Sequence, residues 1–337
     1  MQYEQLGKSD LEVSRICLGC MTYGDPAWRP WILGEDAARE HFKRAFELGI
    51  NFFDTADMYS HGASERITGK LLRELAPRDE YVLASKVFFP VAEGSTEGGL
   101  SRDYILSACE DSLNRLGVDH IDLYQIHRWD HATPLEETLE ALDSLVRDGK
   151  VRYLGASSMA AWQLAKALYT AGEHGWHRFV SMQNHYNLVY REEEREMIPL
   201  CIDQGIGVVP WSPLARGLLT GSRTREDRSA TARAQADPFA DRWYSREEDF
   251  QVVDVLLQVS KERGESPAVV ALAWLLSVPG ITSPIIGSTK VEHIAEATRA
   301  IDLDLTVGEI EKLEAAYQPN SVRGHEQPSP RNMSPSQ

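Results

Sequence analysis

The sequence predicts a single (β/α)8 TIM barrel, and two patterns carry the prediction. Eight short apolar runs recur along the chain, at 16–20, 50–53, 81–85, 121–126, 152–156, 179–182, 206–211 and 281–286. Longer stretches separate them, with apolar residues at three- and four-residue spacing, as on one face of a helix. Strands that alternate with helices form a parallel sheet with right-handed crossovers. Eight such units favour a closed barrel over an open sheet.

The helical pattern is clearest at 35–49, 101–117 and 134–150. Gly49, Gly117 and Gly149 stand at or near the ends of these stretches, where a left-handed C-cap is wanted. We therefore expect helices that stop at these glycines.

Some segments depart from the repeat. Residues 2–15 alternate and turn at Gly7–Asp10, which predicts an N-terminal β-hairpin placed to close the barrel floor. A long loop is predicted at 212–245, and an extra pair of C-terminal helices at 247–277. We expect residues 1–318 to form one barrel domain, followed by a Pro- and Ser-rich tail at 319–337 that is ordered only in part.

The composition narrows the classes of partner. The chain has 337 residues, with 35 basic and 51 acidic side chains and a formal net charge of −16. A globular protein of this charge repels phosphate backbones, so we expect no nucleic-acid partner. No apolar segment follows a basic start and no apolar run reaches membrane-spanning length, so we expect no membrane partner and a cytoplasmic protein. No pattern indicates an oligomeric state.

The cysteines and histidines predict no metal site. Cys17 and Cys20 form a lone C-x-x-C inside an apolar run, where residues three apart on a strand point to opposite faces. We expect these cysteines to be buried in a strand. His127 and His131 are four apart in a predicted loop before Pro134, so zinc is not expected.

Four ionisable residues stand at or just beyond three successive strand ends. They are Asp54, Tyr59, Lys86 and His127. In a TIM barrel, side chains at the carboxyl ends of the strands share one mouth, so we expect these four to form one site. A phenol, an ammonium, a carboxylate and an imidazole are what a carbonyl reductase needs to deliver a proton.

The expected chemistry follows from the side-chain types. Free tyrosine has a pKa near ~10, and a nearby ammonium lowers it. We expect Lys86 to have this effect on Tyr59, and Asp54 to hold Lys86 charged. His127 is expected to donate a hydrogen bond to the carbonyl oxygen, and Tyr59 to give that oxygen its proton.

The later strand ends fit a nicotinamide cofactor, which must supply the hydride because no side chain can. Ser157, Ser158 and Gln183 are suited to bind a carboxamide, and the indole of Trp211 can stack on a nicotinamide ring. Each of these residues also has an ordinary structural interpretation on its own.

The last strand end offers a phosphate site. Gly287, Ser288 and Thr289 precede a predicted helix, whose N-terminal N–H groups attract a phosphate. Lys290 and His293 lie next to it and can meet a 2′-phosphate.

Aromatic residues in the mouth loops suggest a substrate pocket. Trp28, Trp31, Phe88 and Trp129 either line it or simply pack the loops onto the barrel. Arg128 either binds a substrate anion or pairs with Asp130.

Several arginines lie in the predicted long loop. Arg216 is a candidate for a cofactor phosphate, while Arg223, Arg225 and Arg228 are better explained by a solvated face.

The chain resembles the aldo-keto reductase superfamily over about residues 1–318. The motifs that carry the resemblance are LGCMTYG at 18–24, GINFFDTADMY at 49–59, ASK at 84–86, QIHRWD at 125–130, GASSM at 155–159, Q-N-x-Y at 183–186, VVPWSPLARGLLTG at 208–221 and PIIGSTKVEHIAEA at 284–297. The nearest branch is the aryl-alcohol-dehydrogenase-like bacterial reductases. The resemblance implies the barrel fold, NADPH as reductant and a catalytic tetrad at Asp54, Tyr59, Lys86 and His127.

The resemblance also implies cofactor contacts. They fall on Gly19, Met21, Ser157, Gln183, Trp211, Ser212, Leu214, Gly217, Gly287, Thr289 and Glu296. Many members have other residues where this chain has Ser158, His293 and Ala297. An arginine at position 293 would grip an adenosine phosphate bidentately, so its absence leaves NADH possible beside NADPH.

Three functions are therefore compared. The first is reduction of aldehydes and ketones with Tyr59 as proton donor. The second function uses the same cofactor but a sugar-phosphate substrate. It is considered because a family member described as a 1-deoxyxylulose-5-phosphate synthase has similar motifs. The third is an NADPH-binding regulatory subunit like the potassium-channel β-subunits, which the intact Tyr59 and His127 disfavour.

Overall fold

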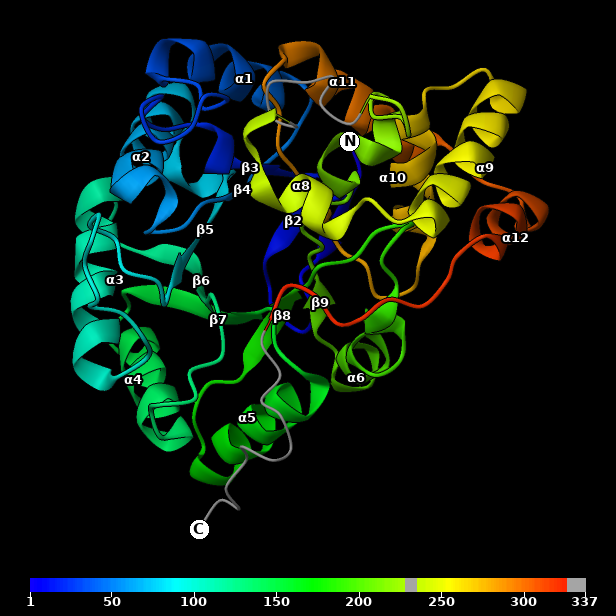
Figure 1. Cartoon of the computed structure of the whole chain (residues 1–337). Helices are drawn as coiled ribbons and strands as arrows, with labels where there is room; N and C mark the ends of the chain where they lie inside the picture. The colour runs from blue at the N-terminus through cyan, green and yellow to red at the C-terminus, as the bar shows by residue number, and fades with distance from the viewer. Residues whose placement is uncertain (228–234, 326–337) are drawn as a thin grey trace.

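The computed structural model describes residues 1–227 and 235–325, and a ring of parallel strands lies at its centre (Figure 1). Neighbouring strands pair in the order β10-β3-β4-β5-β6-β7-β8-β9, and every pair is parallel. All eight predicted strands are confirmed, as β3 (Cys17–Gly19), β4 (Phe52–Asp54), β5 (Val82–Val87), β6 (Ile121–Ile126), β7 (Val151–Ser157), β8 (Phe179–Gln183), β9 (Gly207–Val208) and β10 (Ile285–Ile286).

The two edges of this sheet meet and close the ring. Val208 of β9 forms a parallel bridge with Ile281, just ahead of β10. The amide of Ile285 donates a hydrogen bond to the carbonyl oxygen of Pro210 over 2.9 Å. The predicted (β/α)8 barrel is therefore confirmed.

Helices follow the strands and form an outer layer around the ring (Figure 1). The predicted helices at 35–49, 101–117 and 134–150 are confirmed, and α3 shows why such a stretch folds. The Ser101 hydroxyl accepts from the Tyr104 amide at its start, and Gly117 takes a φ of 66° at its end. The outer layer consists of α1 (Glu35–Glu47), α2 (Ala63–Leu75), α3 (Arg102–Leu116), α4 (Leu135–Arg147), α5 (Ala161–His174), α6 (Met197–Gln204) and α11 (Val291–Arg299).

Short 3-10 turns complete many of the connections. They are η1 (Cys20–Thr22), η2 (Tyr59–Gly62), η3 (Arg78–Glu80), η4 (Glu192–Glu194), η5 (Ala215–Thr220) and η6 (Ala300–Asp302).

The N-terminal hairpin closes the floor of the barrel, as predicted. Strands β1 (Tyr3–Gln5) and β2 (Glu12–Ser14) pair antiparallel. Leu6 and Leu11 from the hairpin are buried in one cluster with Phe52 and Leu123, which come from the barrel strands. Gly7 has a φ of 58°, and a Cβ there would lie 2.4 Å from the Val180 carbonyl oxygen, so only glycine allows this close approach.

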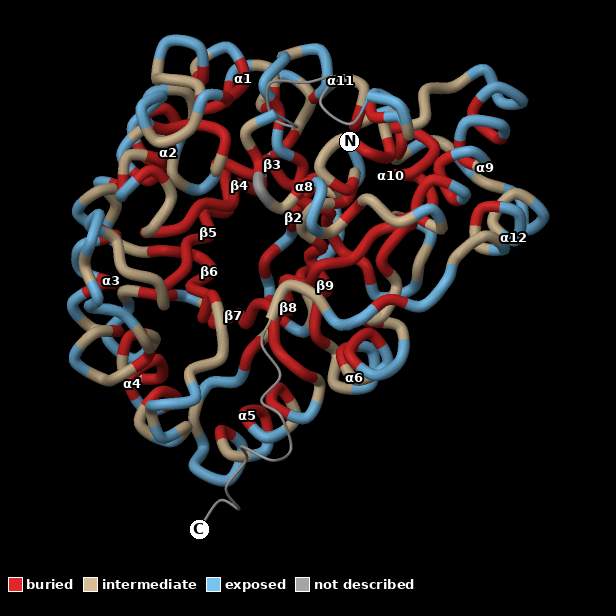
Figure 2. Tube along the Cα trace, viewed as in Figure 1, coloured by how far each residue is buried: buried red, intermediate tan, exposed pale blue. Residues whose placement is uncertain are grey.

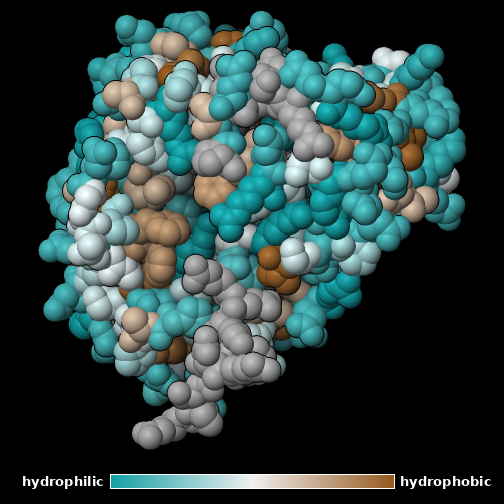
Figure 3. Space-filling model, in the orientation of Figure 1, coloured by the Kyte–Doolittle hydropathy of each residue, from teal (hydrophilic) through white to brown (hydrophobic). Residues whose placement is uncertain are grey.

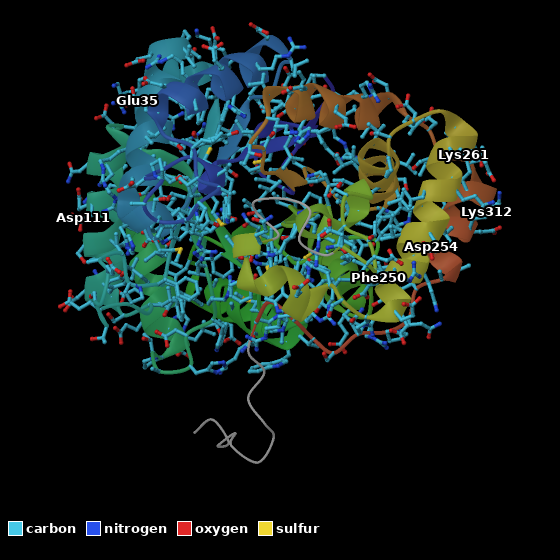
Figure 4. The ribbon with its side chains drawn as sticks, turned by 45° about the horizontal axis from the view of Figure 1, so that its top comes forward. Glu35, Asp111, Phe250, Asp254, Lys261 and Lys312 are labelled. Carbon is cyan, nitrogen blue, oxygen red and sulfur yellow. The ribbon has the colours of Figure 1, made fainter. Side chains whose placement is uncertain are left out.

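The segment between β9 and β10 departs from the simple repeat. It contains η5, α8 (Pro238–Trp243), α9 (Glu247–Arg263) and α10 (Pro267–Ser277), while α12 (Val307–Ala315) follows η6. The predicted helix pair at 247–277 is thus confirmed as α9 and α10, whereas the segment 212–245, predicted as a loop, contains η5 and α8. Figure 4 labels Asp254 and Lys261 on α9 and Lys312 on α12, at the periphery of the molecule.

Burial is highest in the strands of the ring (Figure 2). Cys17 and Cys20 are buried free thiols, as the sequence predicts, but only Cys17 lies in β3 whereas Cys20 begins η1. Register brings the carboxyl ends of neighbouring strands level, because Gly19 pairs with Asp54 and Lys86 with Gln125. The side chains at these ends therefore open into one space.

Candidate active site

A cavity of about 1770 Å³ opens at the carboxyl ends of the strands. The space-filling view shows a recess near the middle of this face, with hydrophobic surface along part of its border (Figure 3). Its wall includes Asp54, Tyr59 and His127. It also includes every residue predicted to contact the cofactor: Gly19, Met21, Ser157, Ser158, Gln183, Trp211, Ser212, Leu214, Arg216, Gly217, Gly287, Ser288, Thr289, Lys290, His293 and Glu296.

Lys86 lies behind this wall and joins two of the predicted catalytic residues. Its side chain is fully buried. The ammonium donates to Asp54 Oδ2 at 2.6 Å, to the Thr55 carbonyl oxygen at 2.8 Å and to the Tyr59 hydroxyl oxygen at 3.4 Å. The three protons of the ammonium can thus serve three acceptors, and they fix the phenol oxygen of Tyr59 at the cavity wall.

The other oxygen of Asp54 is held by two amides. Gln125 and Gln183 donate to Asp54 Oδ1 at 3.0 and 2.9 Å. We expected Gln183 to serve a cofactor carboxamide, whereas its amide nitrogen faces Asp54 in the structure. The sequence analysis missed Gln125, although it lies two residues before His127 and so on the same strand face.

The pKa of Lys86 favours a charged ammonium. Burial lowers this pKa, but the Asp54 carboxylate and the Tyr59 phenol raise it and together outweigh burial. Lys86 and Asp54 therefore form a buried ion pair whose hydrogen bonds replace the lost solvent.

The pKa of Tyr59 moves against our expectation. Burial raises it, and this effect exceeds the lowering by Lys86. The predicted net direction is therefore wrong, because the sequence did not reveal how strongly the packing around the phenol disfavours the charged phenolate. A raised pKa keeps the proton on Tyr59 at neutral pH, as a proton donor requires.

His127 is a neutral ring beside Tyr59. Burial lowers its pKa well below the ordinary value, and the charges of Arg128 and Lys86 lower it further. The ring centroids of His127 and Tyr59 are 5.9 Å apart in an edge-to-face arrangement. Within residues 1–227 and 235–325, His127 Nδ1 has no hydrogen-bond partner. A neutral imidazole carries one N–H, so His127 can donate one hydrogen bond from whichever ring nitrogen is protonated, but it is not a strong acid.

The opposite wall is built around Trp211. Its indole nitrogen donates to the Ser158 hydroxyl at 3.1 Å, and the Ser157 and Ser158 hydroxyls are 3.1 Å apart. One face of the indole stacks on His185, with ring centroids 4.4 Å apart and an interplanar angle of 11°. His185 is itself stacked on Tyr190 at 4.1 Å. This aromatic stack supports Trp211 from behind, and the sequence analysis did not single it out.

The turn after β10 leads into the N-terminus of α11. Lys290 is the N-cap residue, and no side chain caps the helix amides. Ser288 instead accepts from the Lys290 amide at 3.2 Å. Gly287, Thr289, Lys290 and His293 are exposed at the cavity rim. Exposed backbone amides at a helix start beside two basic side chains suit a phosphate group.

The loop after β9 has a strained backbone. Ser212 and Arg216 are non-glycine residues with φ of 54°, and Gly217 has a φ of 93°. Arg216 forms an ion pair with Asp237, and its guanidinium lies 5.2 Å from the centroid of Trp243. Positive φ at non-glycine residues is uncommon and concentrates at ligand sites.

A family model of the aldo/keto reductase family matches residues 15–318. The chain belongs to the aldo/keto reductase family. Family members generally use a nicotinamide cofactor, and the open α11 start, the supported indole and the hydroxyls of Ser157 and Ser158 fit one.

Curated relatives place this aldo/keto reductase among named oxidoreductases. It is 43% identical to the versiconal hemiacetal acetate reductase of Aspergillus parasiticus, over 96% of this chain and 98% of the relative. It is 41% identical to a putative aryl-alcohol dehydrogenase of Schizosaccharomyces pombe, covering 96% and 97%, and 39% identical to one of Saccharomyces cerevisiae, covering 95% and 98%. These relatives are fungal, and they support the aryl-alcohol-dehydrogenase-like resemblance without supporting a bacterial branch.

The wall beyond Tyr59 and His127 is aromatic in this aldo/keto reductase. Its members include Trp28, Trp31, Phe88 and Trp129, which the sequence marked as candidates either for a substrate pocket or for loop packing. The sequence analysis assigned no role to Arg29, whose guanidinium lies 4.6 Å from the Trp28 ring centroid.

The described part of the predicted tail also reaches the cavity. Residues 321–325 line the wall, and Gly324 approaches the Trp211 indole so closely that a Cβ would lie 2.9 Å from it. The Arg323 amide donates to the Tyr190 hydroxyl at 2.9 Å and so fixes the segment. Composition alone marked this segment as a tail, and no local pattern indicates its contacts with Trp211 and Tyr190.

The remaining loop arginines lie off the cavity wall. Arg223 is buried and pairs with Asp241, so the solvated face expected for it is wrong. Arg225 pairs with Glu247 and with Asp254, both on α9. Figure 4 labels Asp254. Arg228 lies outside the described residues.

No group of three or more His, Cys, Asp and Glu side chains in residues 1–227 and 235–325 is arranged to hold a metal ion. Over the same ranges, no helix is both long and apolar enough to span a membrane.

Proposed function

We propose that this aldo/keto reductase reduces aldehydes or ketones to alcohols with NADPH, and that Tyr59 is the proton donor. One observation carries the proposal. The Tyr59 hydroxyl, held 3.4 Å from the Lys86 ammonium, lies on the same cavity wall as His127 and opposite the supported indole of Trp211. A proton donor and a nicotinamide platform thus share one space.

The cofactor, when bound, supplies a hydride to the carbonyl carbon. The chain's own residues hold it in place. Trp211 would hold the nicotinamide ring, and Ser157 and Ser158 would bind its carboxamide. The amides from Gly287 to Thr289 bind a phosphate at the start of α11.

The acid–base half of the site handles the proton. His127 donates an N–H to the carbonyl oxygen and so favours the negative charge that develops there. Tyr59 transfers its phenolic proton to the same oxygen. The Lys86 ammonium stabilises the phenolate that remains, and Asp54 keeps Lys86 charged and oriented.

The preference for NADPH rests on the two basic residues of the α11 start. Lys290 and His293 are exposed at the rim, where an adenosine 2′-phosphate can reach them. Neither offers the bidentate fork of arginine, so NADH remains a weaker alternative in this proposal.

The substrate class rests on the aromatic wall. Trp28, Phe88 and Trp129 suit an aromatic or lipophilic aldehyde, and relatives bear names that refer to aryl alcohols. Small-molecule carbonyl compounds are therefore the proposed substrates.

Consumption of NADPH with 4-nitrobenzaldehyde, followed at the nicotinamide absorbance, tests this function. We expect stoichiometric formation of 4-nitrobenzyl alcohol. NADPH binding without turnover of any aldehyde, ketone or sugar phosphate in a substrate panel would contradict the proposal and favour a regulatory subunit. Turnover restricted to sugar phosphates would favour the synthase-like alternative.

A further inference from the structure

Arg128 follows His127 directly and lines the cavity. Its guanidinium carbon lies 5.4 Å from the ring centroid of Phe89. Its Nη1 donates to the His127 carbonyl oxygen at 2.5 Å. A guanidinium carries five N–H groups, so most of its donor capacity is left for a ligand.

Asp130 does not neutralise Arg128, although the sequence left that pairing open. Asp130 Oδ2 accepts from the Leu100 amide at 2.8 Å and from the Thr133 hydroxyl at 2.7 Å. Its Oδ1 accepts from the Ala132 amide at 2.8 Å. Both oxygens are thus committed to the local loop.

No other acid of the described residues forms an ion pair with Arg128, although the chain as a whole is strongly acidic. Burial lowers the pKa of Arg128 and that of His325, which lies near it and whose pKa falls to about 4. His325 is therefore neutral at physiological pH, and an imidazole in either protonation state cannot supply a counter-charge to Arg128. Arg128 is partly buried at the cavity wall, so its guanidinium loses part of its hydration without gaining a counter-ion, and an anionic ligand would compensate for that loss.

The position of Arg128 in the ring argues against the cofactor as this anion. Arg128 follows β6, whereas the proposed phosphate site follows β10. Three strands, β3, β4 and β5, separate β6 from β10 in the sheet order, and β7, β8 and β9 separate them on the other side. Arg128 therefore faces the cavity from across the barrel and beside His127, where the substrate carbonyl belongs.

We propose that Arg128 is a specificity-determining residue that binds an anionic group, such as a carboxylate, on an aromatic carbonyl substrate. The inference rests on the proposed reductase function and names its substrate class. The planar fork of the guanidinium matches a carboxylate bidentately. The Phe89 ring, 5.1 Å from His127 and next to the guanidinium, supports the aromatic body between carbonyl and anion.

The test compares carboxybenzaldehydes with their uncharged methyl esters. The 2-, 3- and 4-isomers of each are assayed with wild type and with Arg128→Gln. For the acid that wild type reduces best, we expect Arg128→Gln to lower kcat/KM by about 10- to 100-fold, the range for a hydrogen bond to a charged group. The matching ester changes by no more than about threefold.

Two further variants sharpen this test. Arg128→Lys keeps the charge without the fork, so the acid-to-ester ratio should lie between those of wild type and Arg128→Gln. Arg242→Gln removes the same charge from an exposed position on the cavity rim. Arg242→Gln should therefore have the same acid-to-ester ratio of kcat/KM as wild type.

Several outcomes would overturn the proposal. An equal loss on acid and ester would show that Arg128 acts through His127 or the fold. An unchanged ratio in Arg128→Gln, or the same drop in Arg242→Gln, would exclude a specific anion site.

Binding separates this inference from the reductase function. Calorimetric titration with terephthalate needs no turnover, and we expect about tenfold weaker binding by Arg128→Gln than by wild type. Weaker binding in a protein that reduces nothing would refute the reductase function alone. Equal binding by both proteins would refute the anion site alone. A phosphate-bearing aldehyde tests whether phosphate replaces carboxylate at the same guanidinium.

Discussion

The two walls of the cavity are built in different ways. The wall formed by β4, β5 and β6 is a closed network, in which Lys86, Asp54 and Tyr59 bond to one another and two glutamines complete the shell. The wall formed by β7 to β10 is open, with an uncapped helix start at α11 and exposed basic side chains.

This difference between the walls matches the two tasks proposed for them, proton delivery and cofactor binding. A proton must leave from one fixed atom, so the acid–base wall is organised before any ligand arrives. A dinucleotide must enter and leave, so its wall consists of loops, hydroxyls and backbone amides that a ligand can complete. Substitutions in the first wall should therefore affect chemistry and stability, and those in the second should affect cofactor affinity.

Tyr59→Phe should give the largest effect. Removing a general acid lowers the rate by about 10²- to 10⁴-fold, so reduction should fall by this amount. NADPH binding, measured by quenching of tryptophan fluorescence, should stay near that of wild type. Near-full activity in Tyr59→Phe would remove the proton-donor assignment.

Lys86→Met should weaken the fold as well as the reaction. Met leaves the Asp54 carboxylate buried without its cation, and breaking a buried pair costs about 3–5 kcal/mol of unfolding free energy. The midpoint of urea unfolding measures this loss. The double variant Asp54→Asn/Lys86→Met should recover part of the stability, and a double variant no more stable than Lys86→Met would show that the ion pair does not carry the effect.

The pH profile should depend on the direction of the reaction. Reduction needs protonated Tyr59, whose pKa burial raises above its ordinary value of 10.0. The kcat/KM for reduction should stay flat around neutral pH and fall only above about pH 10. Alcohol oxidation needs the phenolate, so its kcat/KM should rise over the same range. A fall in reduction already near pH 7 would contradict the raised pKa.

Lys290→Ala should give a smaller and more selective effect. An exposed ion pair contributes up to about 1 kcal/mol, so the dissociation constant for NADPH should rise about fivefold. The dissociation constant for NADH should not change. Lys261→Ala, an exposed lysine on the outer α9 helix labelled in Figure 4, is the matched control. An unchanged ratio of the two affinities would exclude Lys290 as the 2′-phosphate contact.

More of the wall formed by β4, β5 and β6 could be predicted from the sequence than of the wall formed by β7 to β10. Strand ends at Asp54, Lys86 and His127 follow from apolar runs and barrel geometry, and complementary side-chain types then suggest a shared site. The pKa of Tyr59 was mispredicted because charge is visible in a sequence and shielding from water is not. Gln125 was missed for a similar reason, since an amide attracts attention only when its partner is known.

Long-range contacts explain the other omissions. The stack of His185 on Trp211 joins strand ends β8 and β9, and Gly324 reaches Trp211 from the end of the chain. Neither contact has a local periodicity or a motif of its own. Asp237 likewise pairs with Arg216 across a loop, so the sequence could suggest the arginine but not its partner.

The most direct test of the account follows a deuterium label. Wild type is supplied with NADPH that carries deuterium at the transferable position of the nicotinamide, and with 4-nitrobenzaldehyde in ordinary water. Mass spectrometry should find one deuterium on the carbinol carbon of the alcohol that wild type forms. Tyr59→Phe should form this alcohol far more slowly than wild type. An unlabelled alcohol, or equal rates for the two proteins, would contradict the joint action of a nicotinamide hydride and the Tyr59 proton.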